Sequence, residues 1–325
     1  MYKTIQLFSF LNLLKFIFNP IKGIKVLYKI LSDYPRIQAL PNFEESKKIH
    51  TIKYYKNLIK KNKNLNNFFF SKVYETKNMY FSIQELKNNK ENIIDSLKNN
   101  GFVVIENVLS DQEAKSIDNI FKEMQDNTAD HNIIDAVKVK YGHKDVVDDI
   151  ECITCKKNIS DFPELNNLSD FFSKMVFGKK IKTIAEFFLH KSLNKKEKQK
   201  DDSDTFYHLD RYLPCLKIIY SPDSIDENSG PFCFLKGSHK LDNSLINDWL
   251  IKDNIHKIKD EEKIKFDLKE QKIICKKNSL IVAFTNGFHK RNVFNLENKL
   301  RKTVFFQYTN NFNKFSLYNY LYYNN

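Results

Sequence analysis

The chain of 325 residues lacks an apolar run long enough to cross a membrane. Its most apolar stretch, residues 4–18, is shorter than the roughly 20 residues that a spanning helix needs, and Lys15 interrupts it. No small-residue cleavage motif follows, so the sequence does not predict a secretory signal peptide. Together with an odd number of cysteines, five, this favours a reducing cytoplasm over a disulfide scaffold.

Cysteine pairs with metal-site spacing are also scarce. Cys152-Ile-Thr-Cys155 has the spacing of a zinc or redox motif, but no second pair and no His-x-x-x-His follows it. Structural zinc needs four ligands, and a redox pair needs a thioredoxin-like βαβ context, which the flanking sequence does not show. The sequence therefore predicts structural cysteines here.

Apolar residues and basic charge are plentiful. The hydrophobic fraction of 42% and the aromatic fraction of 14% are enough for a sizeable core. The net charge is +13, but residues 1–65 hold 13 Lys/Arg against 3 Asp/Glu, whereas the rest of the chain holds 40 against 37. We therefore expect a basic helical N-terminal extension over residues 1–90 and a nearly neutral catalytic domain over residues 91–325.

The N-terminal extension allows two interpretations. Lysines at 22, 25 and 29 form a basic stripe beside the apolar positions of residues 21–31. Such a helix fits a peripheral membrane or partner contact through residues 1–36, and a basic surface attracts anionic lipid or nucleic acid. It equally fits a helix packed on the catalytic domain with solvated lysines, which we favour. No nucleic-acid partner is expected; the location is cytoplasmic or peripheral to a membrane.

The first half of a metal site is the pair His208-x-Asp210. On a β-strand, residues i and i+2 point to the same face, so the imidazole and the carboxylate can converge on one point. A second His-x-Asp pair, His143-Lys-Asp145, lacks the strand, the turn and the Gly-Ser-His sequence that follow the first, so we do not expect it to bind metal.

The second half of the metal site is His289, which lies at the end of the loop that follows the apolar strand 280–284. Two histidines and one carboxylate form a facial triad that leaves three cis positions open on an octahedral ion, an arrangement suited to non-haem Fe(II). Arg301 lies on the last strand, where a guanidinium can hold a carboxylate in a bidentate fork. This set is the outline of a 2-oxoglutarate-dependent oxygenase.

An ordered set of motifs resembles the phytanoyl-CoA dioxygenase family, over roughly residues 90 to 309. No single motif is decisive, but their order is informative. They are Asn100–Leu109 with Ser110–Glu113, His208-x-Asp210, Asn228-Ser-Gly230-Pro231, Gly237-Ser-His239, His289 and Arg301-Lys302.

The resemblance implies a mainly β fold with flanking helices, a double-stranded β-helix (jelly roll). It implies Fe(II), 2-oxoglutarate and O2, with hydroxylation of a small-molecule or lipid/sugar-type metabolite and release of succinate and CO2. Carried over by position, His208, Asp210 and His289 bind iron, Arg301 binds the distal carboxylate of 2-oxoglutarate, and Lys217 is a second contact to it.

Three residues refine this expectation. Related halogenases replace the carboxylate ligand with a small residue, so Asp210 favours hydroxylation or desaturation. The position two after the distal histidine is often small and polar in the family, but here it is Arg291. His239 in the Gly-Ser-His turn is expected to be a structural, hydrogen-bonding residue.

Two other functions stay open. One is a cupin-like isomerase or epimerase that uses the same barrel and a metal without 2-oxoglutarate, although Arg301 argues against it. The other is a non-catalytic membrane-associated or nucleic-acid-binding protein that acts through its basic N-terminus.

Several helices and strands can be placed from pattern alone. We expect helices over 82–99 and 111–125, the second with Ser110 and Glu113 as a capping box. We also expect two helical stretches over 170–189, divided near Gly178, and a hairpin formed by residues 271–284. Residues 241–263 form an insertion that either covers the opening or lies on the surface.

Overall fold

The computed structural model describes residues 20–21, 56, 59–72, 78–88, 90–126, 136–140, 150–181, 183–192, 205–210, 214–240 and 269–309. The chain divides into two compact units. One comprises residues 1–62, 244–255 and 310–325, and the other comprises residues 63–243 and 256–309. The fold described below is that of the second unit.

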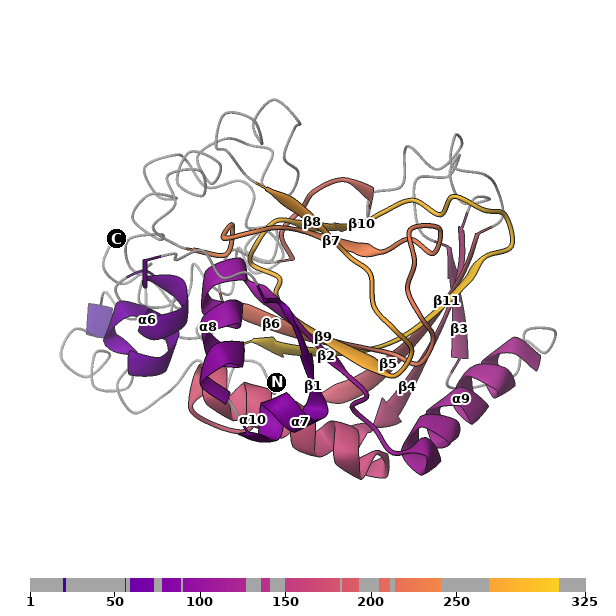
Figure 1. The fold of residues 1–325 in the computed structure, drawn as a ribbon, viewed down its shortest axis with the longest axis horizontal. Helices are drawn as coiled ribbons and strands as arrows, with labels where there is room; N and C mark the ends of the chain where they lie inside the picture. Colours follow the sequence, from indigo (N-terminus) through magenta and orange to yellow (C-terminus); the bar gives the residue numbers. More distant parts are fainter. Residues whose placement is uncertain are drawn as a thin grey trace. The chain divides into compact units, whose positions relative to one another are not determined.

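Two β-sheets form the described part of this unit and face each other (Figure 1). The larger sheet has eight strands in the order β1-β2-β9-β6-β11-β5-β4-β3, and the smaller has the order β10-β7-β8. Neighbouring strands are antiparallel except β1 and β2, which are parallel. The strands are β1 (Tyr80–Ser82), β2 (Phe102–Glu106), β3 (Ala136–Lys140), β4 (Ile150–Asn158), β5 (Ile184–Ser192), β6 (Cys215–Ser221), β7 (Phe232–Leu235), β8 (Glu270–Ile273), β9 (Ser279–Phe284), β10 (His289–Arg291) and β11 (Leu300–Thr309).

The core lies between the two sheets. Alternate residues of β2, β6 and β9, such as Phe102, Ile219 and Ile281, pack against Phe232 and Phe234 of β7 in one buried cluster. Each strand places every second side chain on this inner face, so apolar residues at those positions hold the sheets together. The two-sheet arrangement with flanking helices confirms the expected jelly-roll fold class.

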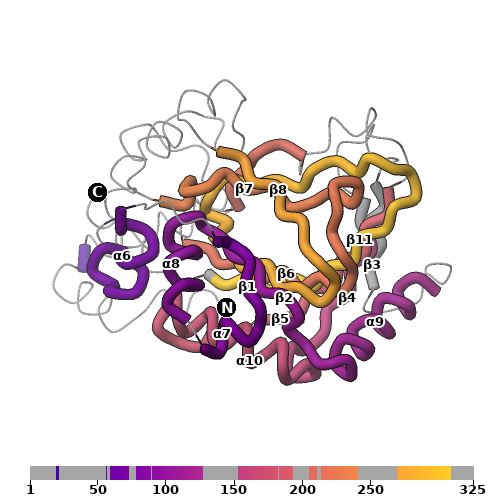
Figure 2. The backbone as a smooth tube through the Cα atoms, in the orientation of Figure 1, coloured from indigo at the N-terminus to yellow at the C-terminus, as the bar shows by residue number. Residues whose placement is uncertain are grey.

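Helices cover the outer face of the large sheet (Figures 1 and 2). The rings of Phe121, on α9, and Phe162 pack against Phe187 on the outer face of β5, with centroids 5.4 and 5.6 Å away. The helices are α6 (Lys63–Phe69), α7 (Ile83–Asn88), α8 (Lys90–Asn100), α9 (Asp111–Asp126), the 3-10 turn η3 (Ile159–Asp161) and α10 (Pro163–Phe177). The expected helices over 82–99 and 111–125 are thus confirmed, the first as α7 and α8.

The expected capping box at α9 forms only in part. The Ser110 hydroxyl accepts a hydrogen bond from Glu113 N at 3.4 Å, as a cap should. The Glu113 carboxylate, however, accepts from Glu164 N and Leu165 N at the start of α10, at 2.9 and 2.8 Å. Glu164 in turn accepts from Ser110 N at 2.6 Å. The two helix starts cap each other, which a local pattern cannot show.

Two local predictions were wrong. Residues 170–189 are not two helices, because α10 ends at Phe177 and β5 begins at Ile184. Gly178 lies between them with φ +72°, the left-handed conformation that ends a helix. Residues 271–284 are not a hairpin either, because β8 pairs with β7 while β9 pairs with β2 and β6. Alternating apolar residues identify a strand but not its partner.

Some expectations fall outside the described residues. These are the helix of residues 21–31 beyond its first position, His143 with Asp145, and the whole insertion 241–263. The domain boundary at residue 90 stays a prediction. Within the described residues, no helix is long and apolar enough to cross a membrane.

Candidate metal centre

The two sheets bring His208 and His289 together through their backbones. His208 N donates to His289 O at 2.9 Å and His289 N donates to His208 O at 3.0 Å, an isolated antiparallel bridge. The two imidazole centroids consequently lie 4.5 Å apart. Because the bridge fixes the backbone of both residues, only the side-chain torsions of the two histidines remain to set the positions of their rings.

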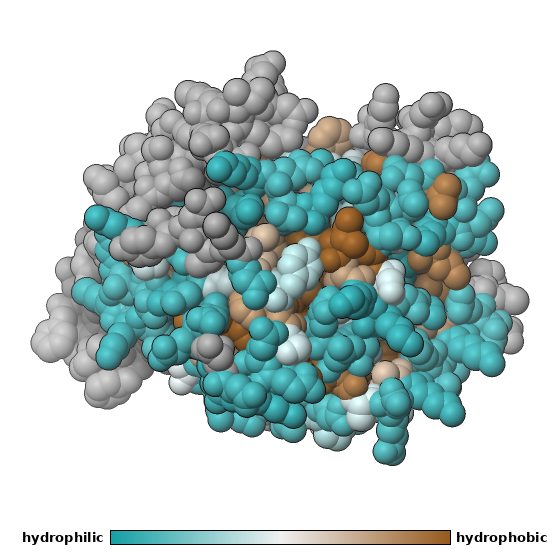
Figure 3. All heavy atoms as spheres, viewed as in Figure 1, coloured by the Kyte–Doolittle hydropathy of each residue, from teal (hydrophilic) through white to brown (hydrophobic). Residues whose placement is uncertain are grey.

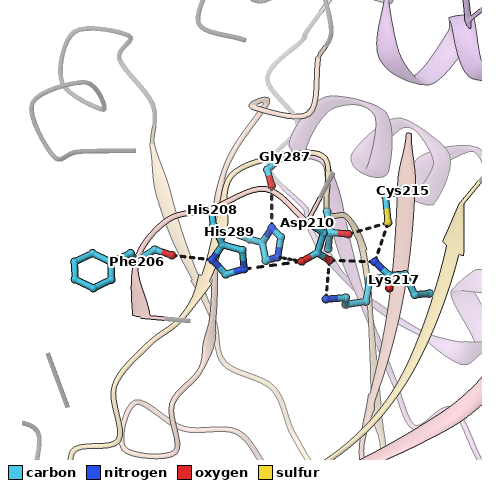
Figure 4. A network of polar contacts seen from close by, with 9 residues as sticks. Phe206, His208, Asp210, Cys215, Lys217, Gly287 and His289 are labelled. Atoms are coloured by element: carbon cyan, nitrogen blue, oxygen red, sulfur yellow. Dashed lines mark hydrogen bonds and ion pairs between the residues drawn. The ribbon is translucent and has the colours of Figure 1, made fainter. Parts of the chain in front are cut away.

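Asp210 joins the two histidines from the same segment. Its backbone N–H donates to Thr285 O at 3.0 Å, which ties it to the loop before His289. Its Oδ1 lies 3.4 Å from His289 Nε2 and 3.9 Å from His208 Nε2 (Figure 4). One ligand atom from each residue lies within 4.8 Å of the others, as the sharing of one ion requires. The sequence motifs thus identified side chains that do converge.

The ring nitrogens of both histidines are arranged for metal binding. His208 Nδ1 lies 2.8 Å from Phe206 O, and His289 Nδ1 lies 2.9 Å from Gly287 O. A carbonyl oxygen accepts only, so each Nδ1 carries a proton, and each Nε2 is turned toward Asp210 and the space beside it, where a bound ion would take its lone pair. This donor set, two imidazole nitrogens and one carboxylate oxygen, fits non-haem Fe(II).

The second oxygen of Asp210 is held from the large sheet. Lys217 Nζ lies 2.7 Å from Asp210 Oδ2, and Gln307 Nε2 donates to the same oxygen at 3.4 Å. Gln307 also contacts the Cys215 sulfur at 3.3 Å, and the Thr285 hydroxyl donates to that sulfur at 3.2 Å. Sequence reasoning missed Gln307, Cys215 and Thr285, because the pairing of β6 with β11 brings Gln307 there and the pairing of β6 with β9 brings Thr285 to Cys215.

These contacts determine the charge of Asp210. Burial by itself raises the pKa of its carboxyl, but the Lys217 ammonium and the adjacent His289 outweigh burial and hold the pKa well below its usual range. The carboxylate is therefore ionised at neutral pH, as the binding of a cation requires.

The Gly237–His239 turn supports the loop that carries His289. The Ser238 hydroxyl accepts from Phe288 N at 2.8 Å, and the Asn286 side chain donates to His239 O at 3.0 Å. The His239 ring stacks on Phe284 at 5.3 Å, and its Nε2 contacts Lys98 O at 2.9 Å. His239 is thus structural, as expected, and the turn acts on the metal centre through the loop.

Helix α6 supports the same loop from outside. The rings of Phe68 and Phe69 lie 5.5 and 4.7 Å from that of Phe284. Lys240 Nζ donates to Phe68 O at 2.8 Å and to Ser71 Oγ at 2.9 Å, at the C-terminal end of the helix. A cation there complements the negative end of the helix dipole.

Arg301 is buried deeper between the sheets. Alternation along β11 places it on the same inner face as Phe305 and Gln307, and its side chain is 4% exposed. Its Nη1 donates to Gly230 O at 2.6 Å, which reaches across to the segment before β7. Arg291, two residues after His289 on β10, is also buried, and both guanidiniums help to keep the pKa of the buried His190 well below its usual value, after burial itself.

Apolar side chains are visible between the sheets. Figure 3 shows apolar atoms at the bottom of a recess in the centre of this face, within a hydrophilic rim. On the inner face of the large sheet, the half-buried rings of Phe188 and Phe305 lie 4.7 Å apart, and Lys217 Nζ lies 5.5 Å from the Phe305 centroid. The inner face beside the metal centre is therefore aromatic with a few charged groups, as ligand pockets commonly are.

The cysteines behave as small buried residues. Cys155, Cys215, Cys233 and Cys275 are buried thiols, and Cys155 lies on β4. Burial raises the pKa of Cys233 to about 12 and that of Cys275 to about 11, so neither thiol is reactive near neutral pH.

Comparison with known families establishes the family of this chain. The family model for phytanoyl-CoA dioxygenase matches residues 97–275, more than half of the chain. The chain belongs to the phytanoyl-CoA dioxygenase family. The match includes His208, Asp210 and Lys217 but ends before His289, which the backbone bridge brings to His208, and before Arg301. Membership confirms the expected cofactors, Fe(II), 2-oxoglutarate and O2, which are those of the family.

Solved structures with a similar fold include EctD from S. alaskensis with bound Fe, 13% identical, with a TM-score of 0.47 over 75% of this chain and 81% of that one. The epimerase SnoN from nogalamycin biosynthesis, crystallised with Fe3+, alpha ketoglutarate and nogalamycin RO, is 15% identical, with a TM-score of 0.44 over 65% and 80%. AviO1 from Streptomyces viridochromogenes is 12% identical, with a TM-score of 0.43 over 66% and 91%. Such likeness concerns the fold alone. No curated protein matches the chain significantly.

Proposed function

We propose that this member of the phytanoyl-CoA dioxygenase family is an Fe(II)- and 2-oxoglutarate-dependent dioxygenase that hydroxylates a small-molecule or lipid/sugar-type metabolite. Succinate and CO2 are the coproducts. The observation that carries the proposal is the convergence of His208 Nε2, Asp210 Oδ1 and His289 Nε2, from separate parts of the chain, within the span of one metal ion.

Each residue has a defined task in this proposal. His208, Asp210 and His289 hold the iron, which with 2-oxoglutarate and O2 supplies the oxidising chemistry. Arg301 binds the distal carboxylate of 2-oxoglutarate, because a buried guanidinium on the inner face offers a bidentate fork. Lys217 is a further candidate contact to the cosubstrate from the same face of the sheet.

The type of reaction follows from the ligand set. Asp210 keeps the carboxylate that a halogenase lacks, so no coordination position is vacated for a halide. Phe305, half-buried on the inner face of the large sheet, lies beside Lys217, which contacts Asp210, and this apolar surface suits a substrate with an apolar portion. Hydroxylation of a C–H bond on such a substrate is the reaction that this site supports best.

Succinate formation tests the proposal. Purified protein loaded anaerobically with Fe(II) and then given 2-oxoglutarate and O2 should form succinate, even slowly without substrate. Asp210→Ala should abolish it, because the metal loses one of three ligands. Asp223→Ala is the matched control, since Asp223 is an exposed acid that pairs with Lys302. Equal turnover in Asp210→Ala and wild type would refute the ligand assignment.

The same measurement separates the alternatives. A metal-dependent isomerase or epimerase that works without 2-oxoglutarate would bind the metal yet form no succinate under any condition. A non-catalytic protein acting through its basic N-terminus would neither bind a metal at the triad nor form succinate. Sedimentation of the full chain with vesicles containing phosphatidylserine tests the predicted peripheral membrane contact of residues 1–36 independently.

A further inference from the structure

The two oxygens of Asp210 face different partners. Oδ1 faces the Nε2 atoms of His289 and His208, at 3.4 and 3.9 Å. Oδ2 faces the large sheet, where Lys217 Nζ lies at 2.7 Å and Gln307 Nε2 at 3.4 Å (Figure 4). One oxygen therefore belongs to the metal centre and the other to a fixed pair of donors.

The pairing of two strands places the two donors, Lys217 and Gln307, side by side. Lys217 on β6 and Gln307 on β11 are register partners in adjacent antiparallel strands, so their side chains emerge next to each other on the inner face. The Lys217 ammonium lies over the Phe305 ring, 5.5 Å from its centroid, which restrains the long side chain. Gln307 is restrained by its contact with the Cys215 sulfur.

We propose that Lys217 is a positioning residue for Asp210: with Gln307 it holds Oδ2, so that the carboxylate binds the metal through Oδ1 alone. The inference rests on the proposed function in one respect, the binding of a divalent ion by the triad. It assigns to Lys217 a role on the ligand in place of a contact to 2-oxoglutarate.

Holding Oδ2 has a consequence for the number of open positions. A carboxylate that is free on both oxygens can bind a divalent ion through both. The triad would then occupy four of the six coordination positions instead of three. With Oδ2 engaged by an ammonium, the triad occupies three positions and leaves three. A chelating keto acid and O2 need all three, so the site would fail if Asp210 became bidentate.

The ammonium also has an electrostatic effect. A positive charge in contact with the carboxylate lowers the donor strength of Asp210 and repels the incoming cation. Lys217 therefore weakens metal binding while preserving the coordination geometry. A residue needed only for folding would do the opposite, since its loss would weaken metal binding.

Mn(II) is the probe, because water-proton relaxation counts the water molecules bound to it without any turnover. Wild-type protein should hold about three inner-sphere waters on Mn(II), and Lys217→Met about two, a fall in relaxivity of about a third. Lys217→Met should also bind Mn(II) about tenfold more tightly, because the nearby positive charge is gone. Lys217→Arg, which keeps the charge and the donors, should restore both wild-type values.

Lys276→Met is the matched control, because Lys276 is an exposed lysine paired with Glu106 on an outer turn, and it should behave as wild type. If Lys217→Met does not fold, as circular dichroism would show, Lys217→Gln replaces it and should still bind Mn(II) more tightly, since it lacks the charge. Wild-type affinity in the folded neutral variant overturns the proposal, as does wild-type relaxivity in folded Lys217→Met.

The outcome also separates this inference from the proposed function. If wild-type protein binds no Mn(II), the metal centre itself is refuted. If wild type binds Mn(II), and Lys217→Met retains its affinity and water count but binds 2-oxoglutarate more weakly, Lys217 is a cosubstrate contact and the positioning role is overturned.

Discussion

His208 and His289 are hydrogen-bonded to each other, backbone to backbone, in both directions, with N···O distances of 2.9 and 3.0 Å. The bridge places the two imidazole ligands on adjoining segments of the barrel rim. It depends on the carbonyl and amide groups, which no side-chain substitution removes. The metal centre is consequently built into the backbone of the fold before any ion binds.

Metal binding should therefore stabilise a fold that already exists. We expect the protein treated with a chelator to stay folded and the addition of Mn(II) or Fe(II) to raise its melting temperature. Binding to the folded state alone adds about 2.7 kcal/mol at a free ion concentration of 100 times Kd. Thermal denaturation with and without metal measures this. His289→Ala should abolish the shift, and a shift of wild-type size in that variant would contradict the ligand assignment.

Arg301→Ala should weaken the binding of 2-oxoglutarate far more than that of the metal. Loss of a buried charge-assisted fork costs about 2–4 kcal/mol, or roughly 30- to 1000-fold in affinity. Titration of the metal-loaded protein with 2-oxoglutarate measures it. Lys302→Ala is the control, because Lys302 follows Arg301 on the strand but points to the other face, toward Asp118 and Asp223. Equal effects of the two substitutions would contradict the role of Arg301.

Gly287→Ala should reduce metal affinity by about ten- to a hundredfold, as the loss of an outer-shell contact does. A Cβ at Gly287 would lie 2.5 Å from Phe234 Cζ and 3.0 Å from His239 N, and Gly287 O is the acceptor that orients His289. The loop must shift, and the imidazole shifts with it. Isothermal titration with Mn(II) gives the affinity.

Gly178→Ala is the control for that substitution. Gly178 ends α10 with φ +72°, so alanine there is strained and should cost about 1 kcal/mol of stability. It does not contact the metal loop, so Mn(II) affinity should stay at the wild-type value. A similar loss of affinity in both glycine variants would mean that general destabilisation, and not displacement of His289, is the cause.

Acid should destabilise the protein below about pH 6.5 through its buried histidines. Burial holds the pKa of His190 and His239 well below the usual value, so the folded protein keeps both neutral. As the pH falls below about 6.5, the unfolded chain takes up these protons and the folded one does not, so stability falls by up to about 1.4 kcal/mol per pH unit for each histidine.

His239→Gln tests this pH dependence. Glutamine keeps an N–H donor for Lys98 O but does not titrate. The slope of unfolding free energy against pH between about 5 and 6.5 should therefore lose the contribution of one histidine, up to about 1.4 kcal/mol per pH unit. Urea denaturation at a series of pH values gives the slope. An unchanged slope would show that His239 is protonated in the folded state.

The convergence of His208 with Asp210 could be predicted because the spacing of the two residues has a geometric consequence. His208 and Asp210 are i and i+2 on an extended segment, so they face the same way in any fold that contains it. Their partners on Oδ2 could not be predicted in the same way. The cosubstrate contact of Lys217 stays a prediction, and no sequence pattern indicated that its ammonium lies 2.7 Å from Asp210 or that Gln307 donates to the same oxygen.

By itself, the sequence determined several strands, such as β2 and β9, the family and the candidate triad, because local alternation, turn residues and motif order are properties of neighbouring positions. Only the tertiary structure decided which strand pairs with which. β8 pairs with β7 and not with β9, and Glu113 caps the following helix α10. The pairing of β6 with β11 brings Lys217 and Gln307 to one carboxylate oxygen. The physical reason is that backbone hydrogen bonds between strands are the same for almost every residue type. Which strands pair therefore depends on the burial of whole faces of the sheets and not on a local pattern.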